Sequence, residues 1–131
     1  MPKLDGVLET SIYVDDLDRS VRFYQLIFGF QVIENGDRLY ALGVASRQVL
    51  LLFKKGASAD LAVGSHDGDG RLHLAFAVPA KELETWQAWL EYHHVTIEQR
   101  RVWERGGQSL YFRDPDQHLI ELATPGVWTI Y

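Results

Sequence analysis

The chain contains no cysteine, and this absence removes several kinds of chemistry at once. Without thiols there is no disulfide bond, no cysteine nucleophile and no thiolate metal ligand. A cysteine-free chain fits a reducing compartment such as the cytoplasm. The first residues, Met1 to Asp5, lack the apolar stretch of a signal peptide, and no run approaches the ~20 apolar residues of a membrane span. We therefore expect a soluble, cytoplasmic protein with no membrane partner.

Positive charge is also scarce. Lys and Arg number 13 against 18 Asp and Glu, which gives a net charge of −5. A nucleic-acid-binding surface needs clustered basic side chains, so we expect no nucleic-acid partner. The chain has 131 residues, of which 47% are apolar, and this is ordinary for one globular domain with a real core.

One segment of the chain occurs twice. Residues 8–14 (LETSIYV) align with residues 72–78 (LHLAFAV), so that Glu9 matches His73 at an offset of 64 (73 − 9). Both segments alternate in the way that half-buried strands do. Each is followed by a stretch with helical spacing and then by three more strand-like runs. The sequence therefore predicts two copies of a β-α-β-β-β pattern.

In the first copy the predicted helix starts among the aspartates of residues 15–18, which favour a helix N-terminus, and stops at Gly29. Asn35-Gly36 is a hairpin signal. The predicted strands are Val7–Val14, Phe30–Glu34, Arg38–Val44 and Gln48–Phe53.

In the second copy a helix is predicted from Pro79 to about His94, with Leu83, Trp86 and Leu90 on one face. Aligning Gly56 with Gly126 places Leu51 over Glu121 at an offset of 70 (121 − 51), so the second copy has gained six residues, which we assign to the loop of residues 100–107. The predicted strands are Leu72–Val78, Val95–Gln99, Gln108–Arg113 and His118–Ala123. Residues 56–70 form a glycine-rich linker, either a flexible joint or a loop with a function.

Three side chains in these strands are potential metal ligands. Glu9 and His73 occupy the same position in the two copies, and Glu121 lies in the last strand of the second copy. Each alone has another explanation, because an edge carboxylate can reach water and a core histidine can bond the backbone. Together they predict one divalent metal ion, since a carboxylate among apolar neighbours is costly to bury without a partner.

One imidazole and two carboxylates make an oxygen-rich ligand set. Ligand softness favours Mn²⁺, Fe²⁺ or Mg²⁺, with Zn²⁺ and Ni²⁺ as the alternatives. Three protein ligands also leave coordination positions open, as a catalytic metal requires.

Several motifs together resemble a known superfamily. They are residues 13–17 (YVDDL) leading to Phe23-Tyr24, Gly29-Phe30, residues 73–76 (HLAF), and residues 111–118 (YFRDPDQH) leading to residues 120–122 (IEL). This combination is similar to the vicinal oxygen chelate superfamily, which includes glyoxalases, extradiol dioxygenases, fosfomycin-resistance transferases and bleomycin-resistance proteins. The resemblance covers about residues 7–128.

The resemblance implies an α+β fold of two tandem βαβββ units, whose curved mixed sheets form a cup-shaped partial barrel. The whole chain, residues 1–131, would be one such domain, with its units at about 7–55 and 71–126. The resemblance also implies that Glu9, His73 and Glu121 bind the metal. It further implies a homodimer with sites shared between chains, where one chain supplies Glu9 and the other supplies His73 and Glu121.

Two positions depart from the family pattern. Glu9 stands where related three-ligand sites have histidine, and Leu51 stands where glyoxalase I has a fourth ligand. Leucine can neither ligate a metal nor take a proton, so we expect little or no isomerase activity of the glyoxalase kind.

The resemblance gives catalytic roles to Tyr111 and Ser11, whose hydroxyls could hydrogen-bond a chelated substrate; Tyr111 could equally be a packed core residue. We predict a metal-dependent enzyme acting on a small molecule that chelates through adjacent oxygens, by dioxygenase, lyase or isomerase, or transferase chemistry. The alternatives are a metal-free small-molecule or antibiotic binding protein of the bleomycin-resistance type, and a structural relic with a vestigial site.

Overall fold

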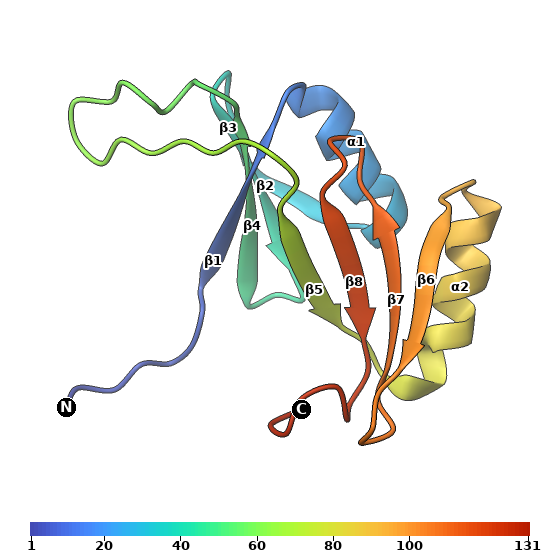
Figure 1. The fold of residues 1–131 in the computed structure, drawn as a ribbon. Coiled ribbons are helices and arrows are strands. Elements are labelled where there is room, and N and C mark those ends of the chain that lie inside the picture. Colours follow the sequence, from blue (N-terminus) through green and yellow to red (C-terminus); the bar gives the residue numbers. More distant parts are fainter. The chain divides into compact units, whose positions relative to one another are not determined.

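Each half of the chain folds into a four-stranded sheet with one long helix, in a computed structural model that describes residues 1–131 (Figure 1). The first unit spans Met1–Asp69 and the second spans Gly70–Tyr131. Both have the element order β-α-β-β-β, apart from a short 3₁₀ turn in the second. The predicted repeat and the α+β fold class are confirmed.

In the first unit the sheet has the strand order β1-β4-β3-β2. The first and last strands, β1 and β4, run parallel, and the other neighbours are antiparallel. A mixed sheet of this kind needs a helical crossover after its first strand, and α1 provides it. The elements are β1 (Glu9–Val14), α1 (Leu17–Phe28), β2 (Gln31–Asn35), β3 (Leu39–Val44) and β4 (Gln48–Lys54).

The second unit repeats this topology with the order β5-β8-β7-β6, in which β5 and β8 are parallel. Even the local irregularity repeats, because both β2 and β6 carry a bulge where they pair with the next strand. The elements are β5 (His73–Ala77), η1 (Ala80–Glu82), α2 (Leu83–Tyr92), β6 (Ile97–Val102), β7 (Gln108–Arg113) and β8 (Leu119–Ala123).

The strand register confirms the predicted match between the two copies. Ser11 pairs with Leu51 in the first unit, and Ala75 pairs with Glu121 in the second. Leu51 is therefore the structural counterpart of Glu121. The six extra residues do not all lie in the loop of residues 100–107. The bulges are offset by 65 (97 − 32), so one of the six precedes β6 and five follow it.

The first helix has the ends that its sequence predicts. The side chain of Asp16 accepts a hydrogen bond from the backbone N–H of Arg19 at 3.0 Å and so caps the N-terminus. At the other end Gly29 adopts a left-handed conformation with φ 67°. The buried residues of α1 recur at helical spacing and pack toward β3 and β4; they are Leu17, Ser20, Val21, Tyr24 and Ile27.

The second helix is shorter than predicted. Pro79 is followed by a 3₁₀ turn, α2 ends at Tyr92, and His94 takes a positive φ of 58° before the chain enters β6. Leu83 and Leu90 are buried, whereas Trp86 on the same stripe is only half-buried. The strand predicted at 95–99 therefore starts later, at Ile97.

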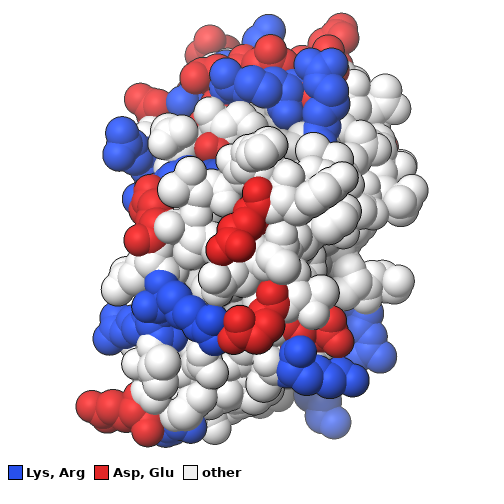
Figure 2. Space-filling view, turned by 90° about the vertical axis from the view of Figure 1, so that its right-hand side faces the viewer, with Lys and Arg blue, Asp and Glu red and all other residues white.

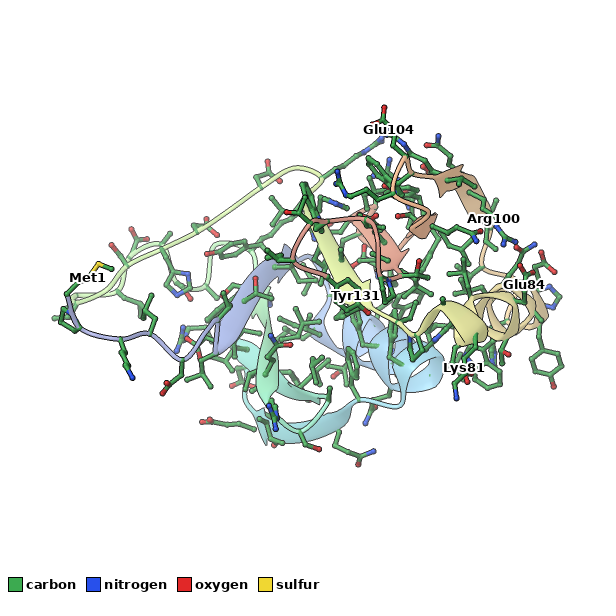
Figure 3. The ribbon with its side chains drawn as sticks, turned by 90° about the horizontal axis from the view of Figure 1, so that it is seen from below. Met1, Lys81, Glu84, Arg100, Glu104 and Tyr131 are labelled. Atoms are coloured by element: carbon green, nitrogen blue, oxygen red, sulfur yellow. The ribbon has the colours of Figure 1, made fainter.

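Polar contacts fix α2 beside β6. Arg100 of β6 bonds the side chain of Gln87 at 3.1 Å. Arg100 also bonds the carboxylate of Glu84 at 2.5 Å (Figure 3). This contact lowers the pKa of Glu84, because the hydrogen bond and the positive charge of Arg100 favour the carboxylate. On the side of the molecule that carries α2, basic and acidic side chains lie interspersed (Figure 2). Neither helix has the length and apolar character needed to cross a membrane.

We expect Gly29→Ala to lower the free energy of unfolding by about 1 kcal/mol, because a β-carbon is disfavoured at positive φ. The added carbon would meet no atom within 4 Å, so the cost is conformational only. Urea denaturation measures it. Gly29→Asn is the matched control and should lose less, since asparagine tolerates this conformation; equal losses would contradict the explanation.

Candidate metal centre

The strand register of the second unit brings four polar side chains onto one face of its sheet. Tyr111 of β7 lies directly opposite Glu121 of β8, and Ser109 lies two residues before Tyr111 in β7. On the other side of β8, His73 of β5 pairs with Leu119. Side chains two residues apart share a face, so His73 and Glu121 are diagonal neighbours. The intervening residues point the other way and are fully buried; they are Leu110, Phe112, Ile120 and Leu122.

Glu121 is a buried carboxylate with defined partners. Its residue is only 6% exposed. One oxygen, Oε1, accepts a hydrogen bond from the hydroxyl of Ser109 at 2.5 Å and another from the hydroxyl of Tyr111 at 3.0 Å. The indole N–H of Trp103 donates in turn to Ser109 Oγ at 2.9 Å. These donors fix the orientation of the carboxylate and direct its second oxygen, Oε2, elsewhere.

That second oxygen faces His73. Nε2 of His73 lies 3.3 Å from Oε2 of Glu121. The other ring nitrogen, Nδ1, lies 2.9 Å from the backbone carbonyl of Leu119. A carbonyl can only accept, so Nδ1 carries a proton. In a neutral imidazole Nε2 then presents a lone pair to a carboxylate, an arrangement that is repulsive unless a cation lies there.

A proton or a metal ion can supply that positive charge. A histidine that ligates a metal through Nε2 commonly donates its Nδ1–H to a backbone carbonyl, as His73 does here. His73 is half-exposed, so an ion has access to the pair. The donor set of one imidazole and one carboxylate, with fixed orientations, therefore fits a divalent metal ion.

The environment of this pair also acts on Tyr111. Burial raises the pKa of its phenol, and the hydrogen bond to the Glu121 carboxylate raises it further. The hydrogen bond with Ser109 and the charge of Arg101 act in the opposite direction but do not prevail. Tyr111 therefore stays protonated at neutral pH and remains a donor to Glu121. Tyr111 is thus a hydrogen-bond partner of Glu121, the predicted metal ligand, as well as a packed residue.

The remaining predicted site residues lie in the first unit. Glu9 and Ser11 are exposed on β1, and alternation puts them on the same face of that strand. Leu51 lies beside Ser11 and is half-buried. His73 and Glu121 are thus brought together in one unit, while the metal role of Glu9 stays a prediction. No group of three or more His, Asp or Glu side chains that could hold a metal is present in the chain.

Two residues of this centre carried no predicted role. Ser109 is fully buried. It lies two residues before Tyr111 in the same strand, and this spacing, visible in the sequence, puts both side chains on one face. Trp103 follows β6 and reaches Ser109 through its indole, with the guanidinium of Arg101 over its ring at 3.7 Å. That contact depends on loop geometry, which residue spacing does not show. His118 is a structural residue: it is buried and its Nδ1 accepts from the backbone N–H of Leu72 at 2.9 Å.

The family model of the Glyoxalase/Bleomycin resistance protein/Dioxygenase superfamily matches residues 6–122. The chain belongs to this superfamily. The resemblance seen in its motifs is confirmed, and the fold described above is the one that solved members share.

Its relatives in this superfamily carry different activities in their names. The chain is 29% identical over 122 residues to the metallothiol transferase FosB of Staphylococcus saprophyticus, covering 92% of this chain and 78% of that protein. It is 32% identical over 110 residues to a catechol-2,3-dioxygenase of Bacillus subtilis, covering 83% of this chain but only 38% of that protein. A crystal structure of a lactoylglutathione lyase from Agrobacterium tumefaciens superposes with a TM-score of 0.91 at 27% identity, covering 98% of this chain and 99% of that one.

We expect Ser109→Ala to lower the free energy of unfolding of the metal-free protein by about 1.5–3 kcal/mol, because a buried carboxylate loses a hydrogen bond. Urea denaturation followed by circular dichroism measures the loss. Ser11→Ala is the matched control, since this serine is exposed on β1 of the first unit and should change stability by less than about 0.5 kcal/mol. Equal effects of the two substitutions would contradict the role of Ser109.

Proposed function

We propose that the protein is a metal-dependent enzyme of the vicinal oxygen chelate type, acting on a small molecule that binds the metal through two adjacent oxygens. The observation that carries this proposal is the pairing of His73 Nε2 with Glu121 Oε2 at 3.3 Å, with Nδ1 held by a backbone carbonyl. Membership of the superfamily supports it independently.

The metal would be held by His73 and Glu121 together with Glu9. One imidazole and two carboxylates favour Mn²⁺, Fe²⁺ or Mg²⁺ over Zn²⁺ or Ni²⁺. When bound, the ion supplies a Lewis acid with open positions for two substrate oxygens. The chain itself fixes the ligands: Ser109 and Tyr111 hold the Glu121 carboxylate, and Leu119 holds the His73 ring.

Two hydroxyls of the chain would orient the substrate. Tyr111 donates a hydrogen bond to Glu121, so its oxygen can accept a hydrogen bond from a substrate hydroxyl. Ser11 shares its strand face with Glu9 and would bond the second substrate oxygen. Both would act by positioning the chelating group.

The reaction is one of those named for the relatives. Dioxygenase, lyase or isomerase, and thiol transferase chemistry are the candidates, in that order of preference. Glyoxalase chemistry lacks its natural base in this chain, because Leu51 occupies the counterpart position of Glu121.

A metal-free binding protein is the second candidate function, and the same contact favours it in one respect. If His73 is protonated, the 3.3 Å pair is a simple imidazolium–carboxylate bridge that needs no ion. Such a protein would sequester its small-molecule ligand without converting it. Metal analysis separates the two functions.

Purified protein should retain one divalent ion per chain, and His73→Ala should abolish this stoichiometric binding because the imidazole ligand is lost. Equilibrium dialysis with Mn²⁺, followed by elemental analysis, measures the ratio. His94→Asn is the control: His94 is exposed at a positive φ that asparagine tolerates, so its binding should match the unmodified protein. Absence of metal from the unmodified protein would favour the metal-free binding function.

We further propose a homodimer in which Glu9 of one chain completes the site formed by His73 and Glu121 of the other. Apolar side chains stand exposed in the segment before β1, where Val7 and Leu8 are 69% and 67% exposed. Exposed apolar side chains of this kind would be buried in a contact between two copies of the chain.

Mixing two inactive variants tests the shared site. Glu9→Ala and His73→Ala should each bind no metal alone, whereas refolding them together should restore about a quarter of the sites, since half of the dimers are mixed and each has one intact site. Elemental analysis after dialysis measures the recovery. If mixing restores nothing while light scattering shows dimers, the ligands come from one chain; a monomer of 15.0 kDa would exclude sharing altogether.

A further inference from the structure

His66 anchors the long loop after β4 to the sheet of the first unit. The hydroxyl of Tyr13 lies 2.8 Å from His66 Nδ1, and the backbone N–H of His66 donates to the carbonyl of Ser58 at 3.1 Å. The imidazole also meets the ring of Phe53 edge-on, with centroids 4.4 Å apart. A residue in a glycine-rich segment is therefore held at one defined place on the strand face.

The ring of Tyr13 is fixed on two sides. Phe53 stacks on it with centroids 5.9 Å apart and planes inclined by 26°. The backbone of Gly68 passes so close that a β-carbon there would lie 2.4 Å from the ring. Only glycine permits this approach, so the loop clamps the tyrosine and leaves its hydroxyl at a set position beside His66.

This pair lies on the same strand face as the predicted ligand Glu9. Glu9, Ser11 and Tyr13 alternate with Ile12 and Val14, which are buried. At about 3.3 Å per residue, Tyr13 is roughly 13 Å from Glu9 along β1. The strand-pair neighbours of Ser11 and Tyr13 are Leu51 and Phe53. This face is therefore polar near Glu9, apolar at Leu51, and aromatic and polar near Tyr13.

We propose that Tyr13 and His66 bind the end of the substrate farthest from its chelating oxygens. The substrate class is a molecule with two adjacent oxygens at one end, a flat apolar body of about 10 Å, and a carboxylate at the other end. The position of the chelating end rests on the proposed function; the binding of the carboxylate end does not.

The pair can recognise a hydrogen-bond acceptor in the tautomer that has its proton on Nε2. When Tyr13 donates to Nδ1, the imidazole carries its proton on Nε2, which takes part in none of the contacts above and can donate to a ligand. The guanidinium of Arg38, 5.5 Å above the Phe53 ring, adds positive charge at this end. The nearby acidic side chains have partners of their own. Asp15 and Asp69 each lie 3.3 Å from Lys55 Nζ, and Asp67 accepts from the backbone of Gly56.

Biphenyl-4-carboxylate, which has the apolar body and the carboxylate but no chelating oxygens, is the probe. It is titrated into the full chain without added metal while the imidazole ¹⁵N–¹H resonances are recorded, and His66→Gln identifies the His66 signal. We expect that signal to shift in a saturable way. Tyr13→Phe should weaken binding about fivefold to tenfold, the effect of one lost hydrogen bond.

Asp67→Ala is the control for the alternative that the Tyr13–His66 contact only anchors the loop. It removes one loop anchor, the acceptor of the Gly56 N–H, whereas the Asp67 side chain takes no part in the hydrogen bond between Tyr13 and His66. Its affinity for the probe should equal that of the unmodified protein. An unmoved His66 signal would overturn the proposal. Equal weakening by Asp67→Ala and Tyr13→Phe would also overturn it, because the pair would then only hold the loop.

Two further probes distinguish this inference from the proposed function. Catechol and 3′,4′-dihydroxybiphenyl-4-carboxylate are compared on Mn²⁺-loaded protein by calorimetry. Tighter binding of the longer probe, lost in Tyr13→Phe, supports both ideas. If no metal binds but biphenyl-4-carboxylate still shifts His66 in a Tyr13-dependent way, the proposed function fails and this inference stands. If catechol binds the metal and the longer probe gains nothing, this inference fails and the proposed function stands.

Discussion

A buried carboxylate is the constraint around which the second unit is organised. An ionised side chain with 6% exposure, as Glu121 has, is costly unless hydrogen bonds and a positive charge compensate for its lost hydration. Ser109 and Tyr111 supply the hydrogen bonds to one oxygen. The second oxygen faces Nε2 of His73. The hydrogen bonds that stabilise the carboxylate also fix its orientation, and the proposed metal site would depend on both effects.

The first unit has the same topology but no buried carboxylate at the position of Glu121. Its register places Leu51 where the second unit has Glu121, and Ala41 pairs with Leu51 as Tyr111 pairs with Glu121. The acid and its donor have thus been replaced together by apolar side chains. Replacing both partners is nearly neutral, whereas removing one leaves an unsatisfied group. The two copies therefore keep one fold while only one retains the buried polar centre, and Glu9 is the polar residue that the first copy keeps at the matching position of its first strand.

The sequence predicts the framework well because local signals determine it. Strand alternation, the Asp16 cap and Gly29 locate the elements of the first unit to within one or two residues, and the repeat brings His73 next to the strand of Glu121. Two kinds of feature escape such reasoning. A left-handed residue, His94, delays the start of β6 beyond its predicted first residue. Contacts made from loops, such as those of Trp103 and His66, depend on where a loop folds back.

The binding of adjacent oxygens and the choice of reaction need separate explanations. The proposed metal held by His73 and Glu121 would bind substrates with adjacent oxygens, but the relatives are named as a transferase, a dioxygenase and a lyase, so membership of the superfamily does not select one reaction. Selection has to come from groups that contact the rest of the substrate. In the first unit the groups that we propose for this are Leu51, which stands where a base could be, and the clamped pair of Tyr13 and His66, about 13 Å along β1 from Glu9. We therefore expect the first unit, which is the less polar copy of the repeat, to determine which substrate binds.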